Sequence, residues 1–255
     1  MTLLYDTESL LQRYMTKLVR NPTLLATNLI TPLIFLVLFS QLFQKFGTFL
    51  PATAGGYLAY LTPGVVLMNA MIFCTQGGVS IVNDLNSGFL SKMLLTRVRR
   101  LSILLGRLLT DAIMAVGMSV ITIVLAVLMG VNFSSGVPGV LLILLTTAFL
   151  EVALSGIFLA VGIATRKVET ISALGGIVFF PLIFLSSAMF PVSFFPSWAQ
   201  TVSNYNPISY AAEVTRDLVS GGLTFNTLAE AYILIAVIGV LTIAATLYQF
   251  RRVIS

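Results

Sequence analysis

The stretch Val82-Asn-Asp-Leu-Asn-Ser-Gly-Phe-Leu-Ser-Lys-Met-Leu-Leu-Thr-Arg-Val-Arg-Arg-Leu101 is the one long polar, cation-rich segment in a chain that is otherwise strongly apolar. Apolar stretches flank it on both sides, so it must lie at one face of a membrane. Phe89, Lys92 and Met93 recur in it at helical spacing, which predicts a short amphipathic helix along the membrane interface. The cations of the segment mark the cytoplasmic face, because loops on that side carry an excess of lysine and arginine.

The composition also indicates a membrane protein. Of the 255 residues, 58% are hydrophobic and 9% are charged, whereas a soluble domain carries about 25% charged residues. The net charge of +5 does not indicate nucleic-acid binding, because the cations lie beside apolar stretches rather than on a soluble surface. A single cysteine excludes an intrachain disulfide and a cysteine cluster for a metal, and the absence of histidine removes the commonest metal ligand and general base. We therefore expect no metal site and no catalytic residue.

Residues 1–22 predict an amphipathic helix on the cytoplasmic surface. Apolar and basic side chains recur on different sides of Asp6–Arg20, and Asp6-Thr7 offers an N-cap. Asn21-Pro22 ends this pattern and turns the chain. A helix surrounded by water is the alternative, but its apolar stripe would meet no soluble core. We therefore expect the basic side to face anionic lipid headgroups.

Residues 23–255 predict an all-α transmembrane domain with six spans. A span needs about 20 apolar residues to cross about 30 Å of hydrocarbon. The predicted spans are 23–43, 57–82, 101–130, 139–165, 171–191 and 228–250. Proline or paired glycines interrupt several of them, which is typical of helices that bend or pack closely. Between the fifth and sixth spans we expect short re-entrant helices in the outer leaflet, one of them Ser209–Ser220 with Gly221 as its C-cap.

The distribution of cations gives the orientation. If both termini are cytoplasmic, the inner segments and adjoining span ends hold Arg13, Lys17, Arg20, Lys92, Arg97, Arg99, Arg100, Arg107, Arg166, Lys167, Arg251 and Arg252. The outer segments then hold only Lys45 and Arg216. This asymmetry follows the positive-inside rule. An odd number of spans would put one of the clusters on the wrong side, so the count supports six spans.

A glutamate near the middle of the fourth span is the most informative buried polar residue. An ionisable group at that depth is costly and is by default a candidate for function. Glu151 could carry a proton, contact a cationic substrate, or join helices through a hydrogen bond. Asn69 and Gln76 of the second span are its possible partners. These three residues are candidates for a substrate path.

Two further sets of residues in the spans allow a structural or a functional interpretation. Arg107 and Asp111 lie four residues apart, so they share a helix face and predict a structural ion pair rather than a binding site. Phe73 and Phe180 could line an apolar substrate path, although aromatic residues in spans are more often packing or lipid-facing residues.

The chain has no P-loop. That motif requires a Gly-Lys pair before serine or threonine, and no Gly-Lys pair occurs in the sequence. The chain therefore cannot bind ATP by that route.

Two stretches resemble permeases of the ABC-2 type transporter family. Asp84–Arg100, followed by Leu104-Leu-Gly-Arg107, is similar to the first cytoplasmic loop of that family, which has an acidic residue, Ser-Gly, a short helix, Leu-Thr-Pro and an arginine. Arg97 is a departure, because it stands where proline is usual. Trp198–Gly221, with Asn206-Pro-Ile-Ser-Tyr210 inside it, is similar to the segment before the family's last span. The order of elements fits the family over essentially the whole chain.

The resemblance implies the permease subunit of an ATP-driven exporter in a prokaryotic cell membrane. Two permease copies, identical or different, would pair, and two ATPase subunits would dock on the cytoplasmic side and bind ATP and Mg²⁺; this chain would bind no cofactor. The residues expected to couple it to the ATPase are Asp84, Ser87, Gly88, Phe89, Lys92, Leu94, Leu95, Thr96 and Arg97. The residues expected at an outer gate are Trp198, Asn206, Pro207 and Tyr210.

The substrate class is open on the sequence alone. A hydrophobic or amphipathic drug or lipid is favoured, because the short loops offer no glycan-binding domain and the path would be apolar. A lipid-linked glycan or polysaccharide is the alternative. A proton-coupled secondary transporter using Glu151 is a different class; the absence of a visible internal repeat and the few other intramembrane charges count against it. A membrane anchor without transport activity is a third class.

Overall fold

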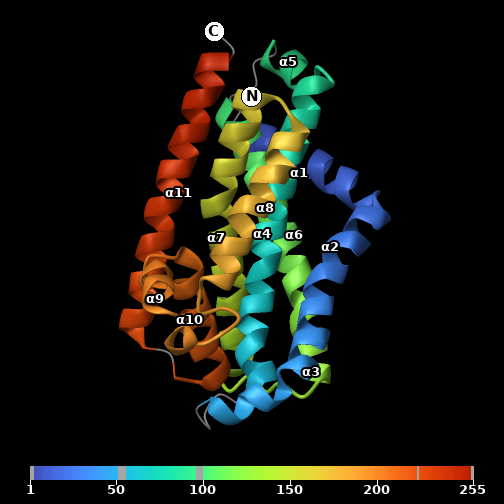
Figure 1. Cartoon of the computed structure of the whole chain (residues 1–255). Helices are drawn as coiled ribbons and strands as arrows, with labels where there is room; N and C mark the ends of the chain where they lie inside the picture. Colours follow the sequence, from blue (N-terminus) through green and yellow to red (C-terminus); the bar gives the residue numbers. More distant parts are fainter. Residues whose placement is uncertain (1–2, 51–55, 96–99, 223, 254–255) are drawn as a thin grey trace.

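The computed structural model describes residues 3–50, 56–95, 100–222 and 224–253. Within these ranges the chain is almost entirely helical and contains no strand. Long helices run side by side along one axis, and the first and last described residues lie toward the same end of the bundle (Figure 1). The short helix α5 (Phe89–Leu94) lies at that end as well. We call it the inner end and the opposite one the outer end.

Five helical segments are long and apolar enough to cross a membrane. They are Pro22–Leu42, Gly56–Asn86, Leu101–Leu128, Gly136–Thr165 and Phe225–Phe250. The first segment joins α2 (Pro22–Ile34), a π-helical turn (Phe35–Phe39) and α3 (Ser40–Leu42). The other four lie in α4 (Gly56–Asn86), α6 (Arg100–Leu128), α7 (Gly136–Thr165) and α11 (Phe225–Val253).

The predicted fifth span corresponds to a shorter helix. α8 (Val168–Phe184) has 17 residues, about 26 Å at 1.5 Å per residue, so it is at the lower limit for crossing the hydrocarbon. Pro181 lies in its last turn, and the helix ends at Phe184, seven residues before the predicted end at Pro191. The five longer segments are therefore established as candidate spans by length and composition, and a span at α8 stays a prediction.

The second span is one continuous helix. Pro63-Gly64 and Gly77-Gly78, which the sequence suggests as interruptions, lie within the 31 residues of α4. The glycines allow close packing instead: a Cβ added at Gly64 would lie 2.3 Å from the carbonyl oxygen of Ala188. A Cβ at Gly78 would lie 2.9 Å from side-chain atoms of Phe158 and Ile171. Small residues therefore place α4 at the centre of the bundle.

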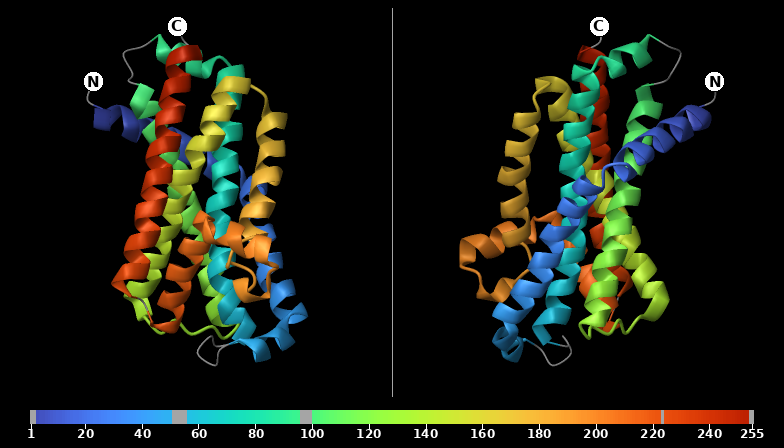
Figure 2. Two further views of the ribbon diagram at one scale, coloured as in Figure 1. Left: turned by 60° about the vertical axis from the view of Figure 1, so that its left-hand side comes forward. Right: turned by 90° about the vertical axis from the view of Figure 1, so that its right-hand side faces the viewer.

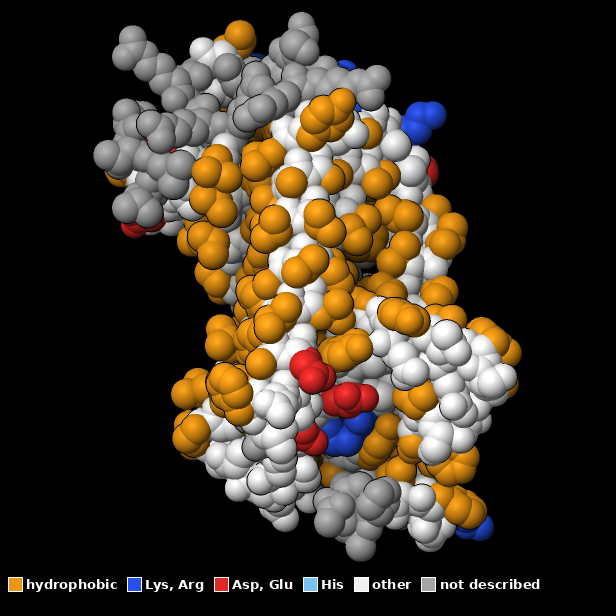
Figure 3. Space-filling view, turned by 90° about the vertical axis from the view of Figure 1, so that its left-hand side faces the viewer, with side chains coloured by type: hydrophobic (Ala, Val, Ile, Leu, Met, Phe, Trp, Pro, Cys, Tyr) orange, Lys and Arg blue, Asp and Glu red, His pale blue; other side chains and the backbone are white. Residues whose placement is uncertain are grey.

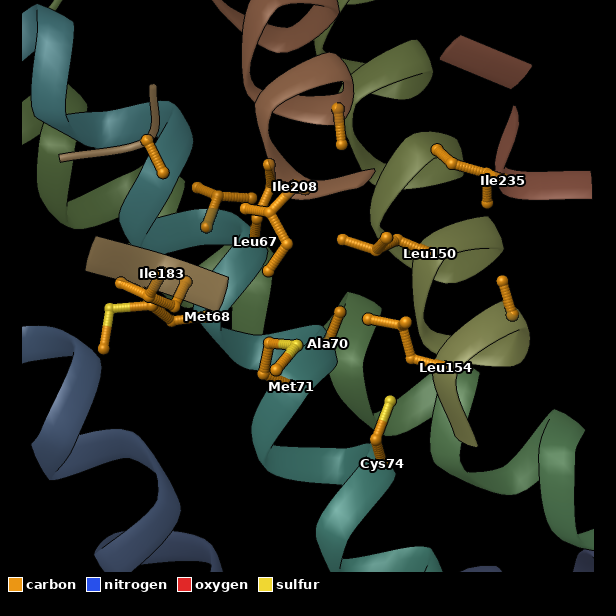
Figure 4. Packing of buried hydrophobic residues seen from close by; sticks show 14 of the residues in the cluster. Leu67, Met68, Ala70, Met71, Cys74, Leu150, Leu154, Ile183, Ile208 and Ile235 are labelled. Carbon is orange, nitrogen blue, oxygen red and sulfur yellow. The ribbon is translucent and has the colours of Figure 1, made fainter. Parts of the chain in front are cut away.

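Buried aliphatic and sulfur-containing side chains around α4 form the main core (Figure 4). The side chains labelled there are Leu67, Met68, Ala70, Met71 and Cys74 of α4, Leu150 and Leu154 of α7, Ile183 of α8, Ile208 of α10 (Pro207–Ser220) and Ile235 of α11. Since lipid tails are as apolar as these side chains, their contribution is close van der Waals packing rather than removal of apolar surface from water.

The N-terminal helix α1 (Leu3–Val19) crosses the inner end of the bundle obliquely (Figure 2). Its apolar stripe includes the buried side chains of Leu10, Tyr14 and Leu18. A Cβ added at Gly106 of α6 would lie 2.9 Å from Cβ of Leu10. The apolar stripe of α1 therefore packs on α6. The sequence predicted an apolar stripe but not this protein surface for it.

Two short helices lie between α8 and α11, beside the outer half of the bundle (Figure 1). They are α9 (Ser197–Asn204) and α10. Asn206 caps α10 by accepting a hydrogen bond from the backbone N–H of Ile208, with Pro207 in the first turn. Gly221 ends α10 with φ +79°, a left-handed conformation that glycine adopts without steric cost. The described structure therefore has a helical segment where the sequence predicts re-entrant helices.

The surface agrees with a membrane setting. Figure 3 shows mostly hydrophobic side chains over the middle of one face, with acidic and basic side chains gathered in a hollow toward the outer end. On α10 and α11, Glu213, Arg216, Asp217 and Glu230 lie close enough to interact electrostatically. Charge is thus kept away from the middle of this face.

Candidate functional site

An acidic residue at the inner end of α4 joins three elements. Asp84 is buried, with 2% of its surface exposed. Its carboxylate accepts hydrogen bonds from Arg13 at 3.4 Å and from Lys17 at 3.3 Å, both on α1. The Arg13 guanidinium carbon also lies 3.3 Å from the centre of the Phe89 ring on α5, a cation–π contact. Asp84 therefore faces α1, and α1 in turn contacts α5.

Tyr14 completes this contact between α1 and the bundle. Its ring is fully buried, and the guanidinium carbons of Arg13 and Arg107 each lie 5.1 Å from its centre. Burial raises the pKa of the Tyr14 hydroxyl, and the neighbouring Asp84 carboxylate raises it further. Tyr14 is therefore neutral at physiological pH and acts as an apolar anchor with two cations at its faces.

The helix α5 has a buried and an exposed side. Leu90 and Met93 are buried, whereas Lys92 is exposed and Leu95, just after the helix, is 89% exposed. Among the large hydrophobic side chains that the structure describes, Leu95 has the highest exposed fraction. A helix anchored by one side thus presents an apolar and a cationic side chain at the inner end.

The remaining predicted coupling residues have different positions. Ser87 is exposed and its hydroxyl donates to the Asp84 carbonyl, while Gly88 has φ +70° and makes the turn between α4 and α5. Leu94 ends α5. Thr96 and Arg97 lie outside the described residues, so their predicted role stays a prediction.

The predicted ion pair in α6 is present. Arg107 donates to Asp111 from Nε at 2.7 Å and from a terminal nitrogen, and it donates to Ser80 Oγ of α4 at 2.9 Å. The exposed fraction is 1% for Arg107 and 0% for Asp111. The two-point contact compensates both charges, each of which would be costly to bury without its partner.

Glu151 is fully buried in α7, and neither of its carboxylate oxygens has a hydrogen-bond partner among the described residues. The expected partners bond elsewhere: Asn69 donates to Thr122 and to the Val66 carbonyl, and Gln76 donates to Asn28. The structure therefore does not bring the polar candidates for the substrate path together.

The aromatic candidates for the path have different surroundings. Phe73 is fully buried in a small cluster that includes Leu18 and Met118, between α1 and α6. Phe180 is 55% exposed and stacks on Phe184, with ring centres 6.1 Å apart. Their environments are those of a packing residue and a lipid-facing residue.

The predicted gate residues surround the junction of α8, α9 and α10. Asn206 is buried and donates to the carbonyls of Leu182 and Leu185 at 2.8 and 3.1 Å. Tyr210 donates to the Asn204 carbonyl at 2.9 Å, and Trp198 is 62% exposed. Asn206 and Pro207 thus join two short helices to the end of α8.

A mainly apolar pocket of about 370 Å³ opens at this junction. Its lining residues are Pro181, Leu182, Thr201, Val202, Tyr205, Asn206 and Pro207. No side chain among them is charged. The pocket can therefore accept an apolar group.

Sequence reasoning missed the arginine that holds the outer segment. Arg216 of α10 donates to the Ser187 carbonyl at 2.6 Å, and its guanidinium carbon lies 3.8 Å from the centre of the Tyr60 ring. Burial lowers the pKa of the Arg216 guanidinium, while Tyr60 and Glu213 counteract this effect. The sequence showed Arg216 only as an isolated cation on the predicted outer side, which does not indicate its partners.

The chain belongs to the ABC-2 type transporter family, whose sequence pattern it matches over residues 5–219. It is a multi-pass membrane permease of that family, as the all-helical bundle with five candidate spans also indicates.

Named relatives support this assignment. The chain is 30% identical over 204 residues to "Daunorubicin resistance ABC transporter permease protein DrrB1" of Streptomyces coeruleorubidus, which covers 80% of this chain and 71% of the relative. It is 29% identical over 215 residues to "Putative transport permease ycf38" of Cyanophora paradoxa, covering 83% and 73%. It is 23% identical over 224 residues to "Probable doxorubicin resistance ABC transporter permease protein DrrC" of Mycobacterium tuberculosis, covering 86% and 79%.

Proposed function

We propose that this chain is the membrane subunit of an ATP-driven exporter and that a separate ATPase docks on residues 83–100. The family assignment supports the permease role, and the absence of a Gly-Lys pair leaves the chain without a P-loop. ATP and Mg²⁺ would bind to the ATPase, so this chain is not catalytic by itself.

The observation that carries the proposal is the two-sided packing of α5. The buried side chains of Leu90 and Met93 pack α5 against the bundle, whereas Lys92 on α5 and Leu95 just after it are exposed. A partner that moves α5 would move the inner end of α4, because α5 follows α4 directly and packs on it. The exposed leucine provides apolar contact area, and the lysine favours an acidic partner surface.

The same element would also move the N-terminal helix. Arg13 contacts both Phe89 on α5 and Asp84 on α4. A displacement of α5 must therefore either carry α1 with it or break these contacts. We infer that α1 belongs to the moving part of the inner end.

We place both termini and α5 in the cytoplasm of a prokaryotic cell. We count α8 as a span as well, which brings the number of spans to six. The cations of the sequence support this orientation under the positive-inside rule. The proposed assembly has two permease copies and two ATPase subunits.

We propose a hydrophobic or amphipathic drug or lipid as the substrate. The apolar pocket beside Asn206 and the daunorubicin and doxorubicin named for two relatives support this class. An apolar molecule dissolved in the membrane could enter the pocket, because it would exchange its contacts with lipid for contacts with the apolar lining. A lipid-linked glycan is the alternative, since its lipid tail needs a similar pocket.

The test compares two exposed leucines: Leu95, just after α5 at the inner end, and Leu128, the last residue of α6, at the outer end. The purified permease is reconstituted in liposomes with its candidate ATPase, and ATP hydrolysis is measured against ATPase concentration. Leu95→Ala should weaken the association roughly tenfold or more, because it removes an apolar side chain from the contact. Leu128→Ala is the matched control, because Leu128 is 79% exposed at the outer end of α6 and should leave hydrolysis unchanged.

Equal behaviour of the two variants would refute docking at α5. If no ATPase associates and transport instead follows a proton gradient, the secondary-transporter alternative gains support. Glu151→Gln then decides it, because a proton carrier loses gradient-driven transport when its carboxyl is replaced by an amide.

A further inference from the structure

A pocket of about 260 Å³ with both polar and apolar lining lies at the inner end, between α1, α2, α4 and α6. Its lining residues are Lys17, Leu18, Asn21, Leu24, Gln76, Val79, Ser80, Asn83 and Arg107. The exporter mechanism proposed above assigns no role to this pocket.

The lining favours an anion. It contains two cationic side chains, three amides and a hydroxyl, and no carboxylate. Lys17 is the more accessible cation, with 49% of its side chain exposed, whereas Arg107 is 1% exposed. A negatively charged group entering the pocket would thus meet hydrogen-bond donors and one accessible ammonium group.

The neighbouring ion pairs leave positive charge available. Asp84 is shared by Arg13 and Lys17, and Asp111 is held by Arg107. These pairs contain three cations and two carboxylates. Arg13, Lys17 and Asp84 together carry one net positive charge, so a ligand anion could share the partly exposed ammonium group of Lys17 with Asp84.

The pocket also has an apolar part. Leu18, Leu24 and Val79 contribute its apolar lining. Only 22% of the span Pro22–Leu42 is buried in the bundle, so most of this segment, which contains α2, is left uncovered by the rest of the described chain. A ligand that diffuses in the membrane can therefore reach the pocket from the side.

We propose that this pocket binds the headgroup of an anionic phospholipid from the leaflet at the inner end. The phosphate lies near Lys17 and Asn83, and the glycerol end of the lipid contacts the apolar lining. A choline headgroup binds less well, because its cation finds no carboxylate in the lining. The proposal does not depend on the ATPase, since the site is complete in this chain.

A bound headgroup would connect the N-terminal helix to the bundle. It would touch Lys17 on α1, Asn83 on α4 and the vicinity of Arg107 on α6. Asp84 and Tyr14 already join these same elements. Anionic lipid should therefore stabilise the docked position of α1.

The test is native mass spectrometry of the purified full-length permease with added phosphatidylglycerol or phosphatidylcholine. We expect the wild type to retain phosphatidylglycerol preferentially and Lys17→Gln to weaken this retention about fivefold. Lys167→Gln is the matched control: Lys167 is an exposed lysine on the α7–α8 turn at the same end of the bundle, outside the pocket, and its loss should change nothing. Lys17→Arg should preserve the preference, because it keeps the charge.

A second variant guards against an effect of Lys17 on folding. Asn83 is exposed at the pocket and its side chain makes no ion pair, so Asn83→Leu should reduce retention of phosphatidylglycerol without affecting the Asp84 pairs. The proposal is overturned if the wild type retains both lipids equally, or if Lys17→Gln and Lys167→Gln lose lipid to the same extent. Displacement of the lipid by millimolar inorganic phosphate would assign the pocket to a soluble anion instead.

Discussion

The two ends of the bundle are held together by different interactions. At the inner end, charged side chains connect separate elements: Arg13 and Lys17 pair with Asp84, and Arg13 covers the Phe89 ring. At the outer end, packed aromatic rings and hydrogen bonds to backbone carbonyls prevail. Phe43, Phe46, Phe190 and Phe194 lie with Tyr57 in one aromatic cluster.

This difference indicates which end can change its contacts. Arg13 and Lys17 are partly exposed although Asp84 is buried, and ion pairs with exposed partners are weak enough to be exchanged for pairs with another protein or a lipid. Close packing and buried backbone hydrogen bonds cannot be broken without leaving unfilled space and unpaired groups. The inner end is therefore suited to docking and rearrangement, and the outer end to staying closed.

The largest expected effect comes from the one inner-end pair that is deeply buried. Arg107→Ala leaves the Asp111 carboxylate without its partner, which should destabilise the protein by about 3–5 kcal/mol. Thermal unfolding of the purified protein in detergent measures this. Arg107→Leu combined with Asp111→Leu should recover most of the loss, because no charge is then stranded. A change below about 1 kcal/mol for the single variant would show that water or lipid already compensates Asp111.

An intermediate effect is expected where packing holds the outer end. Gly64→Ala would place a methyl group 2.3 Å from the Ala188 carbonyl oxygen, which is backbone and cannot rotate away. Overpacking of this kind costs about 1–3 kcal/mol. Gly176→Ala is the control, because no atom lies within 4 Å of a Cβ added there. Equal unfolding temperatures for the two variants would contradict the close approach of α4 and the Ala188 segment.

The smallest effect is expected for the exchangeable contact. Asp84→Asn removes the pairs with Arg13 and Lys17, whose side chains are 34% and 49% exposed, so the global loss should be about 1 kcal/mol or less. Hydrogen exchange of α1 amides should nevertheless increase, because α1 loses its link to α4. The difference from wild type should shrink at high salt, where such pairs are screened. A salt-independent difference would mean that packing of Tyr14, and not charge, holds α1.

The parts of the fold that were predictable depend on contacts that are local in sequence. Arg107 and Asp111 lie one helical turn apart, so their pairing could be read from the chain. The fifth span was predicted too long, because its apolar residues continue to Pro191. The chain leaves the helix after Phe184, and Ser187 bonds to Ser209 of α10, a contact between segments 22 residues apart.

The candidate site was predictable only in outline. The position of a short amphipathic helix after α4 followed from Phe89, Lys92 and Met93. That Asp84 turns toward α1 did not follow, because its partner Arg13 lies 71 residues away. Asn69 and Gln76 were expected to pair with Glu151, but they bond to Thr122 and Asn28, which lie 53 and 48 residues away. Long-range pairing depends on how the helices cross, and hydrophobic periodicity does not contain that information.

The lone thiol gives this permease a practical advantage. Cys74 is the only cysteine in the chain, is fully buried in α4, and donates a weak hydrogen bond to the Glu151 carbonyl. Maleimide reagents should therefore leave the unmodified protein unlabelled. Two cysteines introduced at exposed positions would carry the only labels, so the distance between them could be followed during transport without first removing the native cysteine.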